Sequence, residues 1–301
     1  MPDRLPPNPF AGARLDRRSE SRDLPDWHEA AIADPDTVFV VSRNTTQLVY
    51  TGGESRIAFL HSDHPFVSAA RARQFVLLGW LDGVRHVLLD LEPDDELDVP
   101  QGASFQELRP LVPALPDEAA SMLAYARALS IWRARNRHCG VCGSPTLPRS
   151  AGHVMRCADE RCGAAFFPRL DPAIIVIVSD GERALLGRQA DWPEGRYSTI
   201  AGFVEPGESL EDAVAREVFE ETGVLVRDAE YRSSQPWPFP SSLMLGFRAY
   251  ARPGSPIRLN GELEDARWFT PEELQARGVM PTSHSISHRL ISEWLADRAR
   301  D

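Results

Sequence analysis

The chain has 301 residues, of which 43% are hydrophobic and 26% charged, and its net charge is −11. This composition is typical of a globular protein with two or three domains, and the acidic surplus argues against nonspecific nucleic-acid binding and against DNA as a partner. The longest apolar run, residues 173–178, is too short to span a bilayer, and no apolar signal core opens the chain, so we expect no membrane association and a cytoplasmic location.

Residues 1–135 are expected to form an N-terminal domain of mixed α/β structure. The first 25 or so residues are rich in Pro, Arg and Asp and are expected to be a loose arm. Five short β-branched and aromatic runs follow, and Asp82-Gly83 between the last two predicts a two-residue hairpin. Apolar residues at helical spacing predict a helix after Asp117, its expected N-cap. No combination of residues here indicates chemistry.

Residues 136–167 contain all the cysteines of the chain, in a C-x2-C and a C-x4-C pair. Two such pairs can place four thiolates tetrahedrally around Zn²⁺, and clustered cysteines without a signal core favour a metal site over disulfides. We therefore predict a structural zinc ribbon; four unconnected buried thiols are the alternative. His138 and His153 are spare candidate ligands, expected to lie on the surface. The predicted zinc ligands are Cys139, Cys142, Cys157 and Cys162.

Residues 168–301 mix strands and helices, as expected for an α+β domain. Residues 173–180 and 183–189 predict two strands joined by a turn, and residues 242–251 predict another strand after a Pro-rich loop. Residues 270–278 and 283–300 predict helices, the first capped by Thr270 with Glu273. A further helix is predicted from near Leu210 to near Glu221.

Three glutamates gather at the C-terminal end of that helix, where negative charge is unfavourable. Glu217, Glu220 and Glu221 lie within about a 100° arc, and acids in a last turn oppose the macrodipole by roughly 0.3–1 kcal/mol each. Arg216 can reach Glu220 but cannot neutralise three carboxylates. Mg²⁺ or Mn²⁺ would compensate the charge and leave room for a substrate phosphate; a solvated acidic face is the alternative.

The segment from Gly202 to Val224 resembles the Nudix box, G-x5-E-x7-REUxEExGU, at every position. The resemblance implies an α/β/α sandwich and Mg²⁺- or Mn²⁺-dependent hydrolysis of a nucleoside diphosphate linked to another moiety. Bound metal would also lower the pKa of the attacking water and stabilise the leaving phosphate. The matching residues are Gly202, Glu208, Arg216, Glu217, Val218, Glu220, Glu221, Gly223 and Val224.

Downstream of the box, prolines alternate with Trp237 and Phe239. Proline fixes the backbone, so these aromatic faces are presented rigidly and suit stacking on flat bases; an aromatic loop that only packs on the core is the alternative. The stretch resembles QPWPFPxS, the signature of NADH pyrophosphatases of the NudC group, whose domain order also matches. Its residues here are Gln235, Pro236, Trp237, Pro238, Phe239, Pro240, Ser241 and Ser242.

The NudC resemblance implies cleavage of NAD(H) to NMN(H) and AMP, removal of the NAD cap from RNA 5′ ends to leave a 5′-monophosphate, and a homodimer. The implied catalytic and metal-binding residues are Arg216, Glu217, Glu220, Glu221, Glu262 and the carbonyl of Ala201. The implied substrate contacts are the signature residues together with Phe167, Phe203 and Ser287. Phe203 and Trp237 would sandwich the nicotinamide, and Phe167 stands where relatives often have tyrosine.

Two departures and two other interpretations remain. The C-x4-C pair stands where the group usually has C-x2-C, which enlarges the second knuckle, and Phe167 lacks the tyrosine hydroxyl. The chain could be a Nudix hydrolase of another dinucleotide such as ADP-ribose, although the intact signature argues against this. It could also be a noncatalytic zinc-ribbon module that binds RNA or protein, although the complete glutamate set argues against that.

Overall fold

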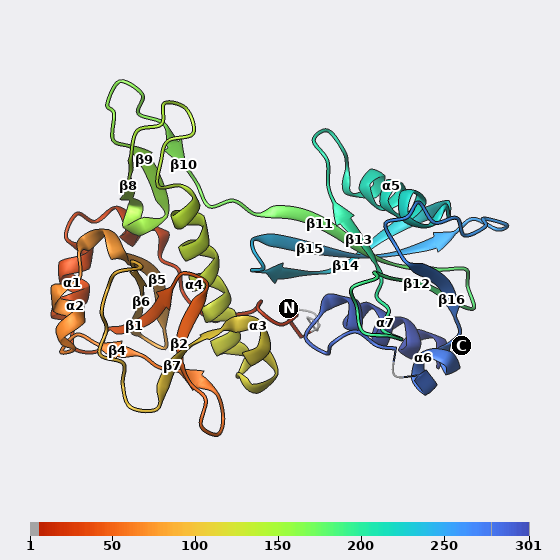
Figure 1. Ribbon diagram of the computed structural model, residues 1–301, viewed down its shortest axis with the longest axis horizontal. Helices are drawn as coiled ribbons and strands as arrows, with labels where there is room; N and C mark the ends of the chain where they lie inside the picture. Colours follow the sequence, from red (N-terminus) through yellow and green to blue (C-terminus); the bar gives the residue numbers. More distant parts are fainter. Residues whose placement is uncertain (1–5, 278, 301) are drawn as a thin grey trace. The chain divides into compact units, whose positions relative to one another are not determined.

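The computed structural model of the chain describes residues 6–277 and 279–300, which divide into two compact units (Figure 1). The N-terminal unit comprises Phe10–Arg169 together with Pro238–Ser241. The C-terminal unit comprises the chain up to Pro9, Leu170–Trp237, and the chain from Ser242 onward. Among the described residues, no helix combines the length and apolarity that crossing a membrane requires.

A seven-stranded sheet forms the core of the N-terminal unit. Strands β1 and β6 are parallel and the other pairs are antiparallel. The predicted hairpin turn is confirmed, with Asp82 and Gly83 at positive φ (49° and 85°) between paired Leu81 and Val84. The path is β3 (Arg56–Ile57), β2 (Thr46–Tyr50), β1 (Val38–Arg43), β6 (Val84–Leu91) and β5 (Phe75–Leu81), with β4 (Leu60–His61) beside β1 and β7 (Ala103–Glu107) beside β2.

The helices of this unit are mostly short. The long predicted helix is present as α4, but its N-cap is Pro116 and not Asp117, because Asp117 is already in the first turn, where a negative charge favours the macrodipole. The helices are η1 (Ser19–Asp23), α1 (Trp27–Ala33), α2 (Pro65–Ala69), η2 (Ala72–Gln74), α3 (Leu108–Leu111), η3 (Val112–Ala114) and α4 (Asp117–Arg135).

The expectation of a loose N-terminal arm is wrong for the residues that the structure describes. Asp16 exchanges backbone hydrogen bonds of 2.7 and 2.8 Å with Trp80 of strand β5. Phe10 is only 4% exposed. Because β5 ends the central path of the sheet, the arm covers an edge that would otherwise present unpaired backbone groups.

The cysteine window forms a small antiparallel sheet within the same unit. Its order is β10 (Ala165–Phe166), β9 (Val154–Cys157) and β8 (Thr146–Arg149). The tight turn η4 (Ser150–Gly152) joins β8 to β9.

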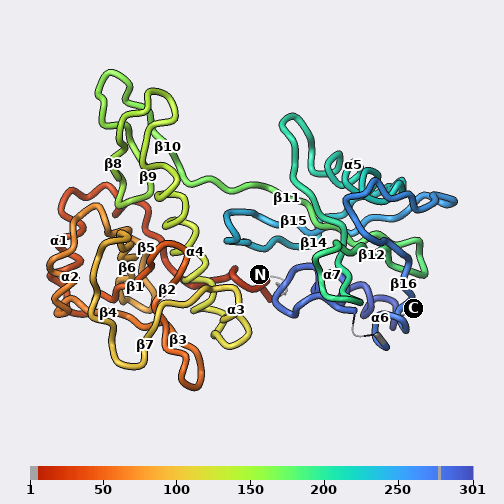
Figure 2. The backbone as a smooth tube through the Cα atoms, viewed as in Figure 1, coloured from red at the N-terminus to blue at the C-terminus, as the bar shows by residue number. Residues whose placement is uncertain are grey.

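The C-terminal unit is a layered sandwich around a six-stranded sheet, which confirms the expected α/β/α architecture. Alternate residues of β11 face opposite cores: Ile174 and Val176 pack with α5, whereas Ile175 and Ile177 pack with α6 and α7. The helices accordingly cover opposite faces (Figures 1 and 2). The order is β14 (Val226–Trp237), β15 (Ser242–Ala251), β11 (Asp171–Ser179), β12 (Ala184–Arg188) and β16 (Asp265–Phe269), with β13 (Ile200–Phe203) beside β11 and helices α5 (Leu210–Thr222), α6 (Pro271–Arg277) and α7 (Ile286–Arg298).

The Pro-rich segment before β15 is shorter as a loop than predicted. Strand β14 continues through Gln235, Pro236 and Trp237, which pair with residues of β15, so that Pro238–Ser241 alone connects the strands. Proline is tolerated because β14 is an edge strand, where a missing N–H need not remove a ladder bond.

Candidate active site

Local signals in the sequence fix both ends of α5, as predicted. The Ser209 hydroxyl accepts a hydrogen bond from the Asp212 amide at 3.1 Å, and the Asp212 carboxylate accepts one from the Ser209 amide at 3.2 Å. At the other end, Gly223 adopts a left-handed conformation with φ of 71°. Val214 and Val218 are buried against the sheet, and Glu221 in the last turn is buried beside them, whereas Glu220 is exposed.

Arg216 contacts several other residues of the Nudix box. Its Nε and Nη2 donate to the two carboxylate oxygens of Glu208, at 2.6 and 2.9 Å, and Nη2 also donates to the carbonyl of Phe203 at 2.9 Å. Its Nη1 lies 2.9 Å from Glu217 Oε1 and donates to Glu220 Oε2 at 3.0 Å. The bond from Arg216 lowers the pKa of Glu208 to about 2, so this pair stays ionised and orients the guanidinium.

Gly202 makes room for one of the glutamates. A Cβ added to this residue of β13 would overlap the carboxylate of Glu217. The close approach of α5 to β13 therefore requires a glycine at the first position of the box. Burial raises the pKa of the Glu217 carboxyl. Ala201, the predicted source of a carbonyl ligand, precedes Gly202 on the strand and pairs with Ile175.

Glu221 is a buried carboxyl surrounded by like charge. It is 5% exposed, and among residues 6–277 and 279–300 it has no ion-pair partner. Burial first, and then the neighbouring Glu262, Glu217 and Glu220, raise its pKa to about 8. The carboxylates here carry more negative charge than the neighbouring arginine can neutralise. Carboxylate oxygens are the ligands that hard divalent cations such as Mg²⁺ prefer.

The glutamates do not converge as a ready-made ligand set, however. Within the described part of the chain, the cysteines alone form a group of three or more ligand atoms within 4.8 Å of one another. Arg216 holds Glu217 and Glu220, and Glu262 is exposed at the surface. The joint coordination of one ion by these residues stays a prediction.

Several predicted substrate contacts lie inside the protein, among them Gln235 and Ser287. Gln235 is 0% exposed: its amide nitrogen donates to the carbonyls of Pro9 and His284, at 3.2 and 2.8 Å, and its oxygen accepts from the amide of Ile286 at 2.8 Å. Ser287 is 2% exposed, and its hydroxyl accepts from the amide of Thr199 at 3.1 Å. Both side chains bind the start of α7 to neighbouring segments.

The aromatic candidates are more accessible. Phe203 on β13 is 59% exposed, Phe167 is 67% exposed, and Trp237 at the end of β14 is half-buried. Phe239 is half-buried in the N-terminal unit: its ring lies edge-on to Phe10, with centroids 5.7 Å apart. The remaining signature residues are Pro238 and Ser242 (buried), Pro236 and Ser241 (half-buried) and Pro240 (exposed).

The guanidiniums of Arg109 and Arg127 lie 5.5 and 5.2 Å from the centroid of the Phe239 ring. Sequence reasoning missed these partners, because arginines more than a hundred positions upstream of the signature carry no local signal of the contact.

The four cysteines meet the requirements of a zinc site. Cys139 and Cys162 have sulfurs 3.7 Å apart, and those of Cys142 and Cys157 are 3.4 Å apart. A tetrahedral Zn²⁺ with ligands at about 2.3 Å requires sulfurs about 3.8 Å apart. The enlarged C-x4-C knuckle therefore does not prevent convergence, and a site closed by four thiolates fits a structural role.

The two histidines near this cluster lie in different environments. His138 is exposed, as expected. His153 is buried, contrary to expectation: its Nε2 lies 2.8 Å from the carbonyl oxygen of Leu77, and burial lowers its pKa to about 3. It is packed in the core of the unit and is absent from the ligand cluster found among the described residues.

Comparison with known families agrees with the order of these elements. Residues 36–132 match the model of an NADH pyrophosphatase-like rudimentary NUDIX domain, residues 134–167 that of an NADH pyrophosphatase zinc ribbon domain, and residues 169–295 that of a NUDIX domain. The sandwich and the complete box thus define a Nudix hydrolase, a class that uses divalent metals.

Relatives that align with most of this chain narrow this class. A NAD-capped RNA hydrolase NudC from Stutzerimonas stutzeri is 43% identical over 221 residues, which cover 73% of this chain and 77% of the relative. A NudC from Mycobacterium bovis is 41% identical over 239 residues, covering 73% and 75%. The human NAD-capped RNA hydrolase NUDT12 is 34% identical over 339 residues, covering 96% and 73%. The chain belongs to this NudC family of Nudix hydrolases.

Proposed function

We propose that the protein hydrolyses the pyrophosphate of NAD(H) to NMN(H) and AMP, and removes the NAD cap from RNA 5′ ends to leave a 5′-monophosphate. The observation that carries the proposal is the complete QPWPFPSS signature directly downstream of a complete Nudix box, in a chain whose relatives are named NAD-capped RNA hydrolases. We further propose that it works as a cytoplasmic homodimer.

The carboxylates of Glu217, Glu220 and Glu221, with Glu262 and the Ala201 carbonyl, would hold Mg²⁺ or Mn²⁺. A bound divalent cation would supply charge for the pyrophosphate and lower the pKa of the attacking water. Arg216, fixed by Glu208, orients Glu217 and Glu220 through its bonds to both. One of these glutamates, or a water relay bound to them, would serve as the base that activates the attacking water.

The exposed ring of Phe203 and the half-buried ring of Trp237 belong to the same unit as the glutamates and offer flat apolar surface to a nicotinamide. The buried residues Gln235 and Ser287 support this site indirectly, since their bonds fix the segments around β13 and the start of α7.

A product assay tests the proposal. The purified protein, with Mg²⁺ or Mn²⁺, is incubated with NADH, NAD, ADP-ribose and a short NAD-capped RNA beside the Glu220→Gln variant. We expect NMNH and AMP from NADH, and a monophosphate end on the RNA, both abolished in the variant. Glu211→Gln, an exposed glutamate in the first turn of the same helix, is the matched control and should retain activity. Cleavage of ADP-ribose alone would contradict the proposed substrate.

A further inference from the structure

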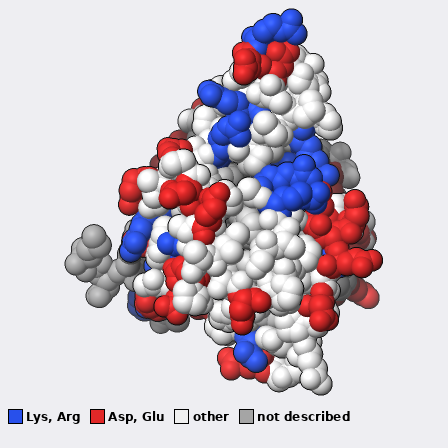
Figure 3. Space-filling model, turned by 90° about the vertical axis from the view of Figure 1, so that its left-hand side faces the viewer, with Lys and Arg blue, Asp and Glu red and all other residues white. Residues whose placement is uncertain are grey.

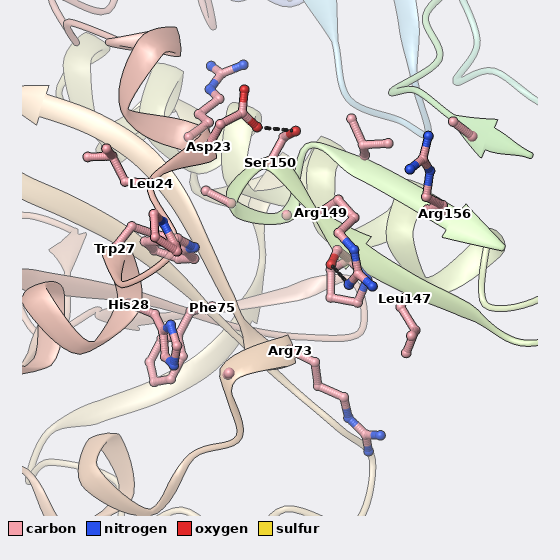
Figure 4. Close-up of a pocket in the computed structure, with 18 of the residues that line it drawn as sticks. Asp23, Leu24, Trp27, His28, Arg73, Phe75, Leu147, Arg149, Ser150 and Arg156 are labelled. Carbon is pink, nitrogen blue, oxygen red and sulfur yellow. Dashed lines mark hydrogen bonds between the residues drawn. The ribbon is translucent and has the colours of Figure 1, made fainter. Parts of the chain in front are cut away.

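The N-terminal unit contains a pocket of 780 Å³ whose lining includes no residue of the Nudix box (Figure 4). One wall comes from the zinc-ribbon sheet, and the other comes from the segment after η1 and the start of β5. Its lining includes Arg22, Trp27, Arg73, Arg149, Arg156 and Phe167.

One face of the zinc-ribbon sheet forms its wall. Leu147 of β8 pairs directly with Arg156 of β9, and Arg149, two residues along β8, projects from the same face. Ala165 of β10 pairs with Arg156 on the other side, so Phe167, two positions on, continues this face. Two apolar side chains that are 42% and 67% exposed, those of Leu147 and Phe167, thus lie on a sheet face with two arginines.

The pocket is positively charged in an acidic protein. Four arginines line it against one carboxylate, that of Asp23, which accepts a hydrogen bond of 2.7 Å from Ser150. Arg73 is paired with Glu92 at 2.7 Å, but in the part of the chain that the structure describes neither Arg149 nor Arg156 has an ion-pair partner. Basic side chains gather in the upper half of the face shown in Figure 3.

The base of the wall is a rigid turn. Ser150, Ala151 and Gly152 follow one another at positive φ of 46°, 48° and 86°, although two of them carry side chains. A Cβ on Gly152 would lie 2.8 Å from a methyl of Val76, so packing against β5 holds the turn in this conformation. Such strain is maintained where the surroundings over-determine it, and it is concentrated at binding and catalytic sites.

We propose that this pocket binds single-stranded RNA, with Arg149 and Arg156 on the phosphates and Phe167 and Trp27 against the bases. Arginine guanidiniums bind phosphate bidentately, and aromatic faces in a positive groove stack on unpaired bases whatever their sequence. The choice of RNA as the ligand rests on the proposed function: the transcript behind the cap is what a deNADding enzyme must hold. Phe167 belongs both to this pocket and to the substrate contacts implied by resemblance.

Binding of a fluorescent, uncapped, single-stranded RNA to the full-length protein tests the inference without catalysis. We expect Arg149→Ala/Arg156→Ala to weaken binding at least tenfold and to flatten the dependence of log affinity on log salt by about 0.7 for each phosphate that is no longer neutralised. Arg149→Lys/Arg156→Lys, which retains charge, should weaken binding less. The matched control is Arg161→Ala: this ribbon arginine has a 92% exposed side chain, contacts Asp159, and lies outside the pocket.

The outcomes separate the alternatives. Undiminished RNA binding by the double alanine variant, with its zinc content and melting temperature intact, would overturn the proposal, and so would equal competition by an acidic polyglutamate peptide. DNA of the same sequence should bind no better than RNA, and tighter binding of DNA contradicts the assignment. If no substrate is hydrolysed but the alanine variant still loses RNA binding, the proposed function fails while the pocket assignment stands. If the alanine variant does not fold, Arg149→Ala alone, an exposed position away from the cysteines, gives the same test.

Discussion

At the scale of single residues, Arg216 and Glu221 perform opposite electrostatic tasks. Arg216 concentrates one positive charge on three glutamates, whereas Glu221 is left buried without a cation among the residues that the structure describes. The local rules for helix ends are broken here, and the proposed binding of a divalent ion would give that violation a physical reason.

Glu221 should make the metal-free protein less stable as pH rises. Its pKa is about 8 in the folded protein, against an ordinary value of 4.5. A raised folded pKa contributes stability below the unfolded pKa, and this contribution is lost as pH rises through the folded pKa. We expect the melting temperature of chelated protein to fall between pH 4.5 and 8, and to fall less in Glu221→Gln. Saturating Mg²⁺ should remove most of the difference, and identical pH profiles for the two proteins would exclude this role.

Arg216→Lys should lower kcat, because an ammonium cannot reproduce the fork that contacts Glu208, Glu217 and Glu220. Loss of a residue that orients metal ligands typically costs about 10–100-fold. Steady-state NADH kinetics over a range of Mg²⁺ concentrations measure this effect. Arg227→Lys is the control and should match wild type, because this exposed arginine contacts its neighbour Asp228 and the ring of Tyr250 and no residue of the Nudix box.

At the scale of elements, the proposed metal site depends on how closely α5 approaches β13. Gly202 permits this approach, because a Cβ at this position would overlap the carboxylate of Glu217. The helix can bring this carboxylate to the strand because Val214 and Val218, on the neighbouring part of its surface, pack on the same sheet.

Gly202→Ala should therefore displace Glu217 and reduce kcat by about 10²-fold, the usual penalty for a misplacement near 1 Å. The apparent Mg²⁺ affinity should fall in parallel. Gly52→Ala is the control, since no atom lies within 4 Å of an added Cβ there. Normal Mg²⁺ affinity in Gly202→Ala would show that Glu217 does not bind the ion.

The zinc ribbon depends on both of its knuckles. Elemental analysis should find one zinc per chain in wild-type protein and little in Cys157→Ser, whose melting temperature should be lower because a closed four-thiolate site contributes directly to folding. Val141→Ala, an exposed change on the first knuckle, should retain the zinc. A zinc-free wild type of equal stability would contradict the assignment.

At the scale of the whole molecule, the polypeptide passes between its two units four times, because Pro9, Arg169, Trp237 and Ser241 each end a segment. The earliest segment is short but well bonded. Asn8 donates to the carbonyl of Ser234 at 2.8 Å, and the carbonyl of Pro9 accepts from Gln235.

Deletion of the residues up to Pro9 should consequently destabilise the C-terminal unit, although the deletion lies outside the Nudix sequence. Each hydrogen bond removed is worth about 0.5–1.5 kcal/mol, so the melting temperature should fall by several degrees, and Asn8→Ala should reproduce part of the decrease. Thermal unfolding followed by tryptophan fluorescence is the measurement. An unchanged midpoint would mean that these bonds contribute nothing.

The parts of the structure that the sequence predicted are those governed by neighbours in the chain. The capping box at Ser209, the glycine after α5 and the Asp82-Gly83 turn are local signals, and all three are as expected. The course of the N-terminal arm and the continuation of β14 through Pro236 depend on distant partners. The burial of Gln235 likewise comes from segments far away in sequence, which no local pattern encodes.

The segmented make-up of the units has a consequence for modularity. The match to the NUDIX domain model begins at residue 169, which suggests a domain that could be excised there and fused to other proteins. Such an excised piece would lack the carbonyl of Pro9 that Gln235 binds. Phe239, in its Pro238–Ser241 segment, would lose its contacts with Phe10, Arg109 and Arg127. Recombination, in nature or in the laboratory, can therefore transfer this enzyme more readily as one whole than as separate pieces.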